Sequence, residues 1–329
     1  MGGKMKVVST VPASRFEKYD VKWPEEWEIV YLKFPYTDDE MIAAAADADV
    51  IFADSIHVVS ANVIAACKNL KMIHTEGVSF NKVDVEAAKN AGVLVCNNRA
   101  VNAAAVAEHC IGLMLSGLRH TARNDRMIKT QGYVATKTQT TAEGVPELAG
   151  KEIGLIGMGV IGREVAKRLI PWGCKLRYYD VVRMNEEVEK EFQLEYMPFE
   201  ELIANSDIIS IHVPVTPGTL RMIGPNQFKL MRKDALLINN SRGEIVDNMA
   251  LAEALEKGQI FGAALDTVDP EPLPEWHPLL HLSPKAEDRL TLTPHIAGMT
   301  DGAFRRMLEW TIRDIRLLEQ GEVPANVVR

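Results

Sequence analysis

Short apolar runs alternate with helical patterns over almost the whole chain. Helical patterns at residues 38–46, 60–67 and 84–90 separate apolar runs of strand character in the first hundred residues. These runs are Lys6–Ser9, Ile29–Leu32, Val50–Ala53, Met72–Thr75 and Val93–Cys96. Alternation of this kind predicts crossover connections and a parallel sheet that is buried on both faces.

A second alternating series begins at Lys151. Its expected strands are Ile153–Ile156, Leu176–Tyr179, Ile208–Val213, Ala235–Asn239, Gly262–Leu265 and Leu290–Thr293. Two series of this kind, in a chain of 329 residues, predict two domains, because domains usually have about 100–200 residues. The fold class expected is α/β, with two Rossmann-like parallel-sheet domains: a flavodoxin-like domain and a doubly wound dinucleotide-binding domain.

Long helices are expected at two places outside the alternating series. Apolar residues recur every four positions over residues 103–118, and a last helix is expected at about residues 301–320. The polar, Thr-rich segment at residues 131–149 between the two series is typical of a loop or a mobile connection.

Composition and charge exclude several function classes. The formal net charge of −8 argues against a nucleic-acid partner, because a polyanion binds a basic surface. No apolar run reaches the ~18 residues of a membrane span, and the N-terminus lacks the pattern of a signal peptide. The four cysteines are scattered without a Cys-x-x-Cys pair. We therefore expect a cytoplasmic protein with neither a disulfide framework nor a metal site.

The strongest local motif is a glycine pattern, Gly157-x-Gly159-x-x-Gly162, that follows a strand and begins a helix. In a dinucleotide-binding turn, Gly157 makes the tight turn, Gly159 lets the backbone approach a pyrophosphate, and Gly162 packs the helix on the strand. The phosphates then lie at the helix N-terminus, beside Val160 and Ile161, where free N–H groups favour anions.

Asp180 indicates which dinucleotide is bound. It ends the next expected strand, 18 residues after Gly162, close to the ~20 residues typical of the acid that binds the adenosine ribose. A carboxylate there accepts hydrogen bonds from the ribose hydroxyls and repels the 2′-phosphate of NADP. Val181 and Val182 follow it, and Arg183 is the nearest base. The sequence therefore predicts NAD as the cofactor.

Four further motifs carry a resemblance to a known family. They are Val106–His109, Asn240–Asp247, Ala264–Pro274 and Thr293–Gly298. Together with the glycine motif, and in this order along essentially the whole chain, they resemble the D-isomer-specific 2-hydroxyacid dehydrogenase family. The resemblance implies an NAD-dependent enzyme that interconverts a 2-oxo acid and its D-2-hydroxy acid.

The family's catalytic Arg, Glu and His correspond to Arg242, Glu271 and His295. Reduction of a ketone needs a hydride at carbon and a proton at oxygen, and an imidazolium is a proton donor near neutral pH. A carboxylate beside it favours the charged imidazole, and a guanidinium offers a planar fork that matches a carboxylate. Taken singly, each residue has an ordinary structural explanation. Arg242 fits a surface or salt-bridge residue, Glu271 fits a solvated charge, and His295 fits a structural histidine.

The resemblance also implies residues that contact the cofactor and the substrate. The other residues expected to contact the cofactor are Val106, His212, Val213, Asn240, Ser241 and Asp266, the last near the nicotinamide carboxamide. The loop Gly77-Val78-Ser79 is similar to one that holds the substrate carboxylate through N–H groups, although the family has glycine where this chain has Ser79. Asn102 matches a family asparagine, or is simply a helix cap. Ile56 stands where phosphoglycerate-specific members have an arginine, which disfavours a phosphorylated substrate.

The expected organisation places residues 102–296, an NAD-binding domain, inside a substrate-binding domain of residues 1–101 plus 297–329. A homodimer that pairs through the NAD-binding domain is expected, with the helix near residues 103–118 in the interface. Two alternatives stay open: a family member that acts on formate or phosphite, and a dinucleotide-sensing scaffold that resembles the family's transcriptional corepressors.

Overall fold

The computed structural model of the chain describes residues 4–54 and 56–328. It divides into two compact units, Met1–Val101 with Met299–Arg329 and, between them in sequence, Asn102–Gly298. We call these the outer unit and the inner unit. Residues 1–3, which belong to the N-terminus considered above for a signal peptide, lie outside the described residues. No helix in the described part of the chain is both long enough and apolar enough to cross a membrane.

The outer unit is built on a five-stranded sheet with the order β2-β1-β3-β4-β5. All its strand pairs are parallel. This order is the flavodoxin-like one, in which the carboxyl ends of the strands form one edge that carries ligand-binding loops. Its strands are β1 (Lys6–Ser9), β2 (Glu28–Tyr31), β3 (Val50–Ala53), β4 (Met72–Thr75) and β5 (Leu94–Cys96).

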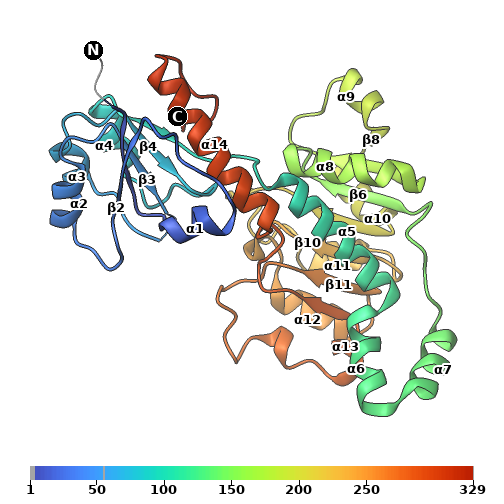
Figure 1. Cartoon of the computed structure of the whole chain (residues 1–329). Helices are drawn as coiled ribbons and strands as arrows, with labels where there is room; N and C mark the ends of the chain where they lie inside the picture. The colour runs from blue at the N-terminus through green and yellow to red at the C-terminus, as the bar shows by residue number, and fades with distance from the viewer. Residues whose placement is uncertain (1–3, 55, 329) are drawn as a thin grey trace. The chain divides into compact units, whose positions relative to one another are not determined.

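The helices of the outer unit include the last helix of the chain, α14, drawn in red beside the blue sheet in Figure 1. Leu308 and Ile315 on α14 are buried with Val7, Phe52 and Met72 of the sheet, so the C-terminal segment completes the core begun by the N-terminal strands. The helices are α1 (Ala13–Lys18), α2 (Asp38–Ala45), α3 (Ala61–Ala66), α4 (Val85–Asn90) and α14 (Asp301–Glu319).

The inner unit is built on a seven-stranded parallel sheet with the order β12-β11-β10-β9-β6-β7-β8. The strand order reverses between β6 and β9, and at such a point the carboxyl ends of the strands leave a crevice for a ligand. The strands are β6 (Glu152–Ile156), β7 (Lys175–Tyr179), β8 (Leu194–Tyr196), β9 (Ile208–Ile211), β10 (Leu236–Asn239), β11 (Gly262–Leu265) and β12 (Leu290–Leu292). The predicted fold class is confirmed in both units.

Helices surround the sheet of the inner unit (Figure 1). The α-helices are α5 (Ala103–Arg119), α6 (Thr121–Gln131), α7 (Tyr133–Glu143), α8 (Val160–Leu169), α9 (Glu186–Glu191), α10 (Phe199–Asn205), α11 (Pro225–Leu230), α12 (Asn248–Glu256) and α13 (Pro284–Glu287). Three short 3₁₀ helices are η1 (Ile170–Trp172), η2 (Gly243–Ile245) and η3 (Pro278–Leu280).

The expectation of a loop over residues 131–149 was wrong, because helix α7 occupies most of that segment. The physical reason is a contact between two helices, which the local sequence pattern does not predict. The buried guanidinium of Arg123 on α6 donates to Thr140 on α7 (3.3 Å) and forms an ion pair with Glu143. Polar partners from a neighbouring helix thus hold a Thr-rich sequence in a helix despite its weak intrinsic propensity.

Candidate functional site

The glycine turn after β6 has the geometry that a dinucleotide-binding turn requires. Gly157 has a φ of +97°, a conformation that side chains rarely adopt. A Cβ on Gly157 would lie 2.8 Å from a methyl of Val213, and a Cβ on Gly162 would lie 2.2 Å from the carbonyl oxygen of Gly157. Neither glycine can therefore be replaced without moving the backbone of the turn.

The rest of the turn is open where a phosphate would need room. A Cβ on Gly159 would meet nothing within 4 Å, and α8 begins directly after it with Val160 and Ile161. The first N–H groups of a helix have no acceptor within the helix, so they are available to an anion. The carboxylate of Asp180, just after β7, accepts from the N–H of Met158 (2.8 Å), which places this acid beside the turn.

Side chains at the ends of β9 and β10 lie at the same edge of the inner sheet. The ring of His212 contacts the Ser210 hydroxyl (Nε2 to Oγ, 2.9 Å), and burial lowers the pKa of His212 to about 4. An imidazole with that pKa is uncharged at neutral pH, which suits a residue that lines a site and does not donate protons in it. The Ser241 hydroxyl donates to the carbonyl of Val213 and ties the two strand ends together.

Asn240, which follows β10, is buried, yet both polar atoms of its side chain lack a hydrogen-bond partner among the described residues. A buried amide without partners is costly, and a nicotinamide dinucleotide has carboxamide, hydroxyl and phosphate groups that pair with an amide. The turn, the Asp180 carboxylate and this unpaired amide fit such a cofactor. Val106, on α5, is a buried core residue.

Glu271 and His295 form a hydrogen-bonded pair in the inner unit. The Nδ1 atom of His295 lies 2.7 Å from Oε2 of Glu271, and both side chains are partly exposed. His295 has a φ of +54°. Strained backbone of this kind in a residue other than glycine persists where the surroundings fix it, often at functional sites. The contact with Glu271 leaves the Nε2 atom of His295 as the ring nitrogen that faces away from the carboxylate.

Asp266 holds the turn that carries His295. Its buried carboxylate accepts from the Thr293 hydroxyl (2.5 Å) and from the N–H groups of Ile296 (3.0 Å) and Ala297 (2.8 Å). Burial alone would raise the pKa of Asp266, but hydrogen bonds, led by those from His109 and Thr293, outweigh burial and lower it to about 2. The predicted contact of Asp266 with the cofactor stays a prediction, and the structure gives this carboxylate a positioning role as well.

A pocket of about 450 Å³ lies beside the pair. Its lining contains Glu271 and His295 together with apolar side chains, including Leu273, Leu280 and Leu292.

Arg242 lies after β10, at the start of η2. Its side chain is exposed and donates to the adjacent Ser241 carbonyl (2.8 Å). Within residues 4–54 and 56–328, the Ser241 carbonyl is the acceptor that this guanidinium contacts, so the rest of its fork of donors is available to a ligand.

In the outer unit, the loop after β4 presents backbone donors. The carbonyl of Gly77 accepts from the Asn98 N–H (3.0 Å), and the carbonyl of Val78 accepts from the Asn97 side chain (2.7 Å). The N–H groups of Gly77, Val78 and Ser79 donate to no other residue that the structure describes. Successive free N–H groups with their carbonyls turned away bind anions, so this loop is a candidate carboxylate site.

Two further residues predicted to bind substrate are Ile56 and Asn102. Ile56 is 72% exposed, so its side chain is free of the core. Asn102 precedes α5 but makes no side-chain cap hydrogen bond, and its amide nitrogen lies against Gly298, where a Cβ would come within 2.3 Å. The helix-cap interpretation of Asn102 therefore does not account for its side chain.

Sequence reasoning missed a second histidine–carboxylate pair, in the outer unit. The Nδ1 atom of His57 lies 2.6 Å from Oδ2 of Asp54, and the Nε2 atom of His57 is buried without a partner in the described residues. Burial alone would raise the pKa of Asp54, but hydrogen bonds, led by that from His57, hold it below its usual value. The spacing of three residues after a strand was the one signal available, and it is common in ordinary turns.

Comparison with known proteins agrees with this geometry. Residues 111–297 match the family model described as D-isomer specific 2-hydroxyacid dehydrogenase, NAD binding domain. The chain is 37% identical over 295 residues to a glyoxylate reductase of Thermofilum pendens, which covers 90% of this chain and 85% of that protein. It is 36% identical over 271 residues to a hydroxypyruvate reductase of Thermotoga maritima, which covers 82% of this chain and 84% of that protein.

Among solved structures, the NAD-complexed D-isomer specific 2-hydroxyacid dehydrogenase of Lactobacillus delbrueckii ssp. bulgaricus superposes with a TM-score of 0.81 at 26% identity, covering 98% of this chain and 99% of that one. The chain belongs to the D-isomer specific 2-hydroxyacid dehydrogenase family. It is therefore an NAD-dependent oxidoreductase that interconverts 2-oxo acids and 2-hydroxy acids. The resemblance inferred from five motifs is confirmed.

Proposed function

We propose that the protein reduces a small 2-oxo acid to its D-2-hydroxy acid, and catalyses the reverse oxidation, with His295 as the proton donor and acceptor. The observation that carries this proposal is the 2.7 Å contact between His295 and Glu271 beside a pocket of about 450 Å³. When bound, the reduced cofactor supplies the hydride that reaches C2 of the substrate. Nε2 of His295 gives its proton to the keto oxygen, so a neutral alcohol forms.

Glu271 and Arg242 support that proton transfer in different ways. The Glu271 carboxylate accepts from Nδ1 of His295, which fixes the ring orientation and keeps Nε2 directed away from the carboxylate. The exposed Arg242 guanidinium binds the substrate carboxylate and polarises the neighbouring carbonyl. As the keto oxygen gains negative charge, this interaction strengthens, so Arg242 acts on the transition state as well as on binding.

We assign the loop Gly77–Ser79 to the substrate carboxylate. Its three N–H groups donate to none of the described residues, and the carbonyls of Gly77 and Val78 are held by other residues. In this proposal the outer unit binds substrate, and Asn102 and Ile56 are further substrate contacts. The inner unit binds the cofactor through the glycine turn and through Val106, His212, Val213, Asn240, Ser241 and Asp266.

The preference for NAD over NADP is assigned to Asp180. Its carboxylate lies beside the turn, where a 2′-phosphate would meet a like charge.

The test of the whole proposal is a panel of 2-oxo acids, starting with glyoxylate and hydroxypyruvate, assayed with NADH and with NADPH through the absorbance of the reduced cofactor. Turnover with NADH on at least one 2-oxo acid supports the proposal. Turnover only with NADPH would overturn the role of Asp180. Reduction of NAD by formate or phosphite, together with no turnover of any 2-oxo acid, would overturn the substrate class.

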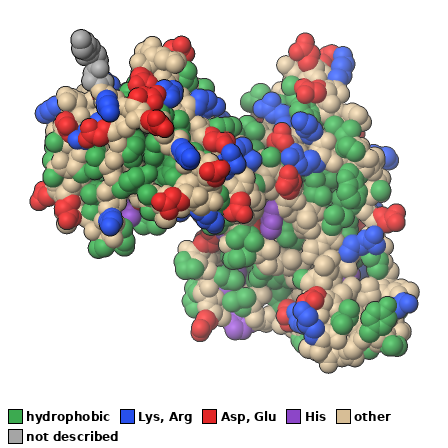
Figure 2. All heavy atoms as spheres, in the orientation of Figure 1, with side chains coloured by type: hydrophobic (Ala, Val, Ile, Leu, Met, Phe, Trp, Pro, Cys, Tyr) green, Lys and Arg blue, Asp and Glu red, His purple; other side chains and the backbone are tan. Residues whose placement is uncertain are grey.

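We also propose a homodimer that pairs through the inner unit. Apolar side chains on α6 and α7 are exposed, Tyr133 at 65% and Val134 at 76%, and Figure 2 shows hydrophobic side chains among charged ones over these helices. Water contact with such side chains is unfavourable, and a second copy would remove it. Sedimentation of the wild type and of Val134→Ser tests this: a dimer weakened by the substitution supports it, and a wild-type monomer at micromolar concentration contradicts it.

The cellular location of the protein stays a prediction. All four cysteines are free, as we expect of a protein in the cytoplasm.

A further inference from the structure

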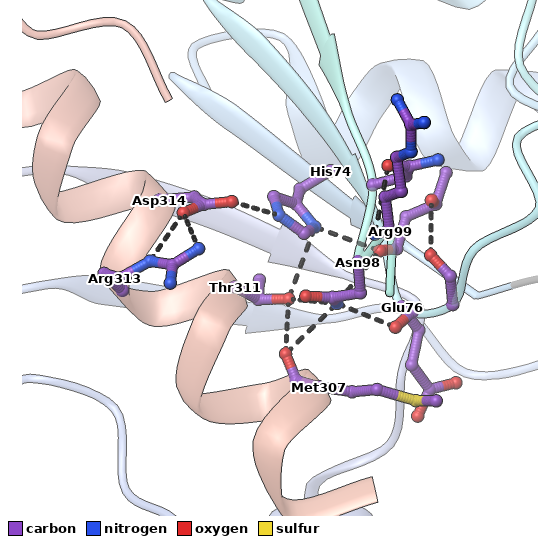
Figure 3. Close-up of polar contacts among 11 residues, drawn as sticks. His74, Glu76, Asn98, Arg99, Met307, Thr311, Arg313 and Asp314 are labelled. Carbon is purple, nitrogen blue, oxygen red and sulfur yellow. Dashed lines mark hydrogen bonds and ion pairs between the residues drawn. The ribbon is translucent and has the colours of Figure 1, made fainter. Parts of the chain in front are cut away.

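A buried polar network in the outer unit contacts the backbone of Thr75 and Glu76, which leads directly into the loop Gly77–Ser79. We call its members, His74, Asn98, Thr311 and Asp314, the anchor network; Figure 3 shows them between the sheet and α14. All four side chains are fully buried. Two come from β4 and the segment after β5, and two come from α14, more than 200 residues away in sequence. None of them has been given a role in the proposed function above.

Asn98 ties the loop backbone to α14. Its amide nitrogen lies 2.8 Å from the carbonyl oxygen of Glu76, 3.1 Å from that of Met307 and 3.2 Å from the hydroxyl of Thr311. The Thr311 hydroxyl donates its hydrogen to the Met307 carbonyl (2.9 Å). It therefore accepts a hydrogen bond from Asn98. The groups around this nitrogen are acceptors, so it must be a donor, and an amide nitrogen has two hydrogens to donate. A carboxylate at position 98 would face the same carbonyls with the wrong charge.

His74 and Asp314 extend the network below the loop. Nδ1 of His74 lies 3.0 Å from the carbonyl oxygen of Thr75, and Nε2 lies 3.2 Å from Oδ2 of Asp314. Arg313 donates to the other carboxylate oxygen of Asp314 (2.9 and 2.8 Å). Although burial alone would raise the pKa of Asp314, hydrogen bonds from His74 and Arg313 lower it.

The consequence is a chain of occupied carbonyls that leads into the loop. The His74 ring contacts the carbonyl of Thr75, and the Asn98 side chain donates to that of Glu76. Within the loop, the backbone N–H of Asn98 donates to the carbonyl of Gly77 and the Asn97 side chain donates to that of Val78. With these two carbonyl oxygens turned towards the protein, the loop presents N–H groups on its other side. A carbonyl that rotated outward would place a negative dipole where the substrate carboxylate is expected.

We propose that the anchor network is a positioning device for substrate binding, through which α14 sets the affinity of the loop Gly77–Ser79 for the substrate carboxylate. This inference rests on the proposed function of that loop. A buried ion pair and a buried amide are not explained by stability alone, because well-packed apolar residues often serve a core equally well or better. Polar networks favour one conformation, because their hydrogen bonds form together only in one geometry.

The sharpest test uses matched substitutions at Thr311. Thr311→Val keeps the shape of the side chain and removes the acceptor of Asn98 and His74, whereas Thr311→Ser keeps the hydroxyl. We expect Thr311→Val to raise the KM for glyoxylate about tenfold, the size of one or two lost hydrogen bonds, with kcat and NADH binding unchanged. Thr311→Ser should behave like the wild type. Asn98→Ala should raise the KM for glyoxylate further, and thermal unfolding checks that each variant is folded.

A change in KM for glyoxylate without a change in NADH affinity supports the inference. It is overturned if Thr311→Val is folded and leaves that KM unchanged, or if the substitution weakens NADH binding and glyoxylate binding alike, since the network would then serve stability only. Should Asn98→Ala not fold, the Thr311→Val and Thr311→Ser pair still decides.

Failure of this inference is distinguishable from failure of the proposed function. Ser79→Pro removes one N–H group from the loop itself, because proline has no backbone N–H. If Ser79→Pro raises the KM for glyoxylate and the substitutions in the anchor network do not, only the inference fails. If Ser79→Pro has no effect on that KM, the assignment of the loop to the substrate carboxylate fails.

Discussion

The two units present their candidate chemistry in different ways. The inner unit does so with side chains: His295, Glu271 and Arg242 project from turns at strand ends, and their groups are at least partly exposed. The outer unit does so with backbone N–H groups, and the side chains that determine their direction are buried behind them. Side chains that react must be of particular types, whereas backbone groups that bind need a particular conformation.

This difference decides what each unit tolerates. In the inner unit, a substitution of a reacting group removes the group itself. In the outer unit, a substitution at the loop leaves the N–H group in place unless proline is introduced, so function depends on the residues that hold the backbone. The expected effects below separate the two cases.

The largest effect is expected at His295. His295→Ala should lower kcat for 2-oxo acid reduction by about 10²–10⁴-fold, the usual contribution of a positioned general acid. NADH binding should stay close to that of the wild type, because no part of the glycine turn changes. Steady-state kinetics and a fluorescence titration with NADH measure the two quantities. A variant with a wild-type kcat would show that another group donates the proton.

Arg242→Ala should have the next largest effect. Loss of a charge-assisted hydrogen bond to a carboxylate costs about 1.5–3 kcal/mol, which corresponds to roughly 10–150-fold in kcat/KM. Both KM and kcat should change, because the guanidinium contacts the substrate before and during the reaction. Arg242→Lys keeps the charge without the fork and should recover part of the loss. Equal kinetics for all three proteins would remove Arg242 from the site.

Asp266→Asn tests the turn that carries His295. The folded-state pKa of Asp266, about 2, lies below its ordinary value of 3.8, which corresponds to a stabilisation of about 2 kcal/mol at neutral pH. A lowered pKa stabilises the fold above pH ~4, and this stabilisation is lost as the pH falls towards ~2. The difference in unfolding free energy between wild type and variant, from urea titrations, should therefore shrink over that range. A difference that is independent of pH would contradict the assignment.

Glu271→Gln should have the smallest effect, on kcat for reduction. The amide oxygen of glutamine still accepts from Nδ1 of His295, so the ring keeps its orientation, whereas Glu271→Ala removes the acceptor and should lower kcat further. Steady-state kinetics of the two variants measure this difference, and NADH binding should stay the same in both. A wild-type kcat for Glu271→Ala would mean that the 2.7 Å contact does not position the ring for the reaction.

The sequence located the candidate site residues more readily than the elements that position them. Gly157, Asp180 and His295 lie where their motifs indicated, because each motif is short, local and tied to the end of a strand. The strands were found through their apolar runs, except β8 (Leu194–Tyr196), whose central residue is Glu195 and whose run is too short to stand out. Helix α7 was missed for a different reason: the residues that hold it in a helix lie on α6.

The anchor network could not be predicted from the sequence. Its hydrogen bonds join residues 209 to 240 positions apart, and a histidine within a strand or an aspartate within a helix carries no local mark of such a partner. The free N–H groups of the loop are likewise a property of conformation. Motif reasoning located the loop Gly77–Ser79, but the residues that direct it required coordinates.

The most direct measurement of the central claim is a comparison of the two enantiomers of one 2-hydroxy acid as substrates. Purified protein is incubated with NAD and with either D-glycerate or L-glycerate, the two possible reduction products of hydroxypyruvate, and NADH formation is followed by absorbance. Formation of NADH with D-glycerate and none above background with L-glycerate is the expected result. NADH formation with L-glycerate and not with D-glycerate would contradict the D-specific activity proposed for this site.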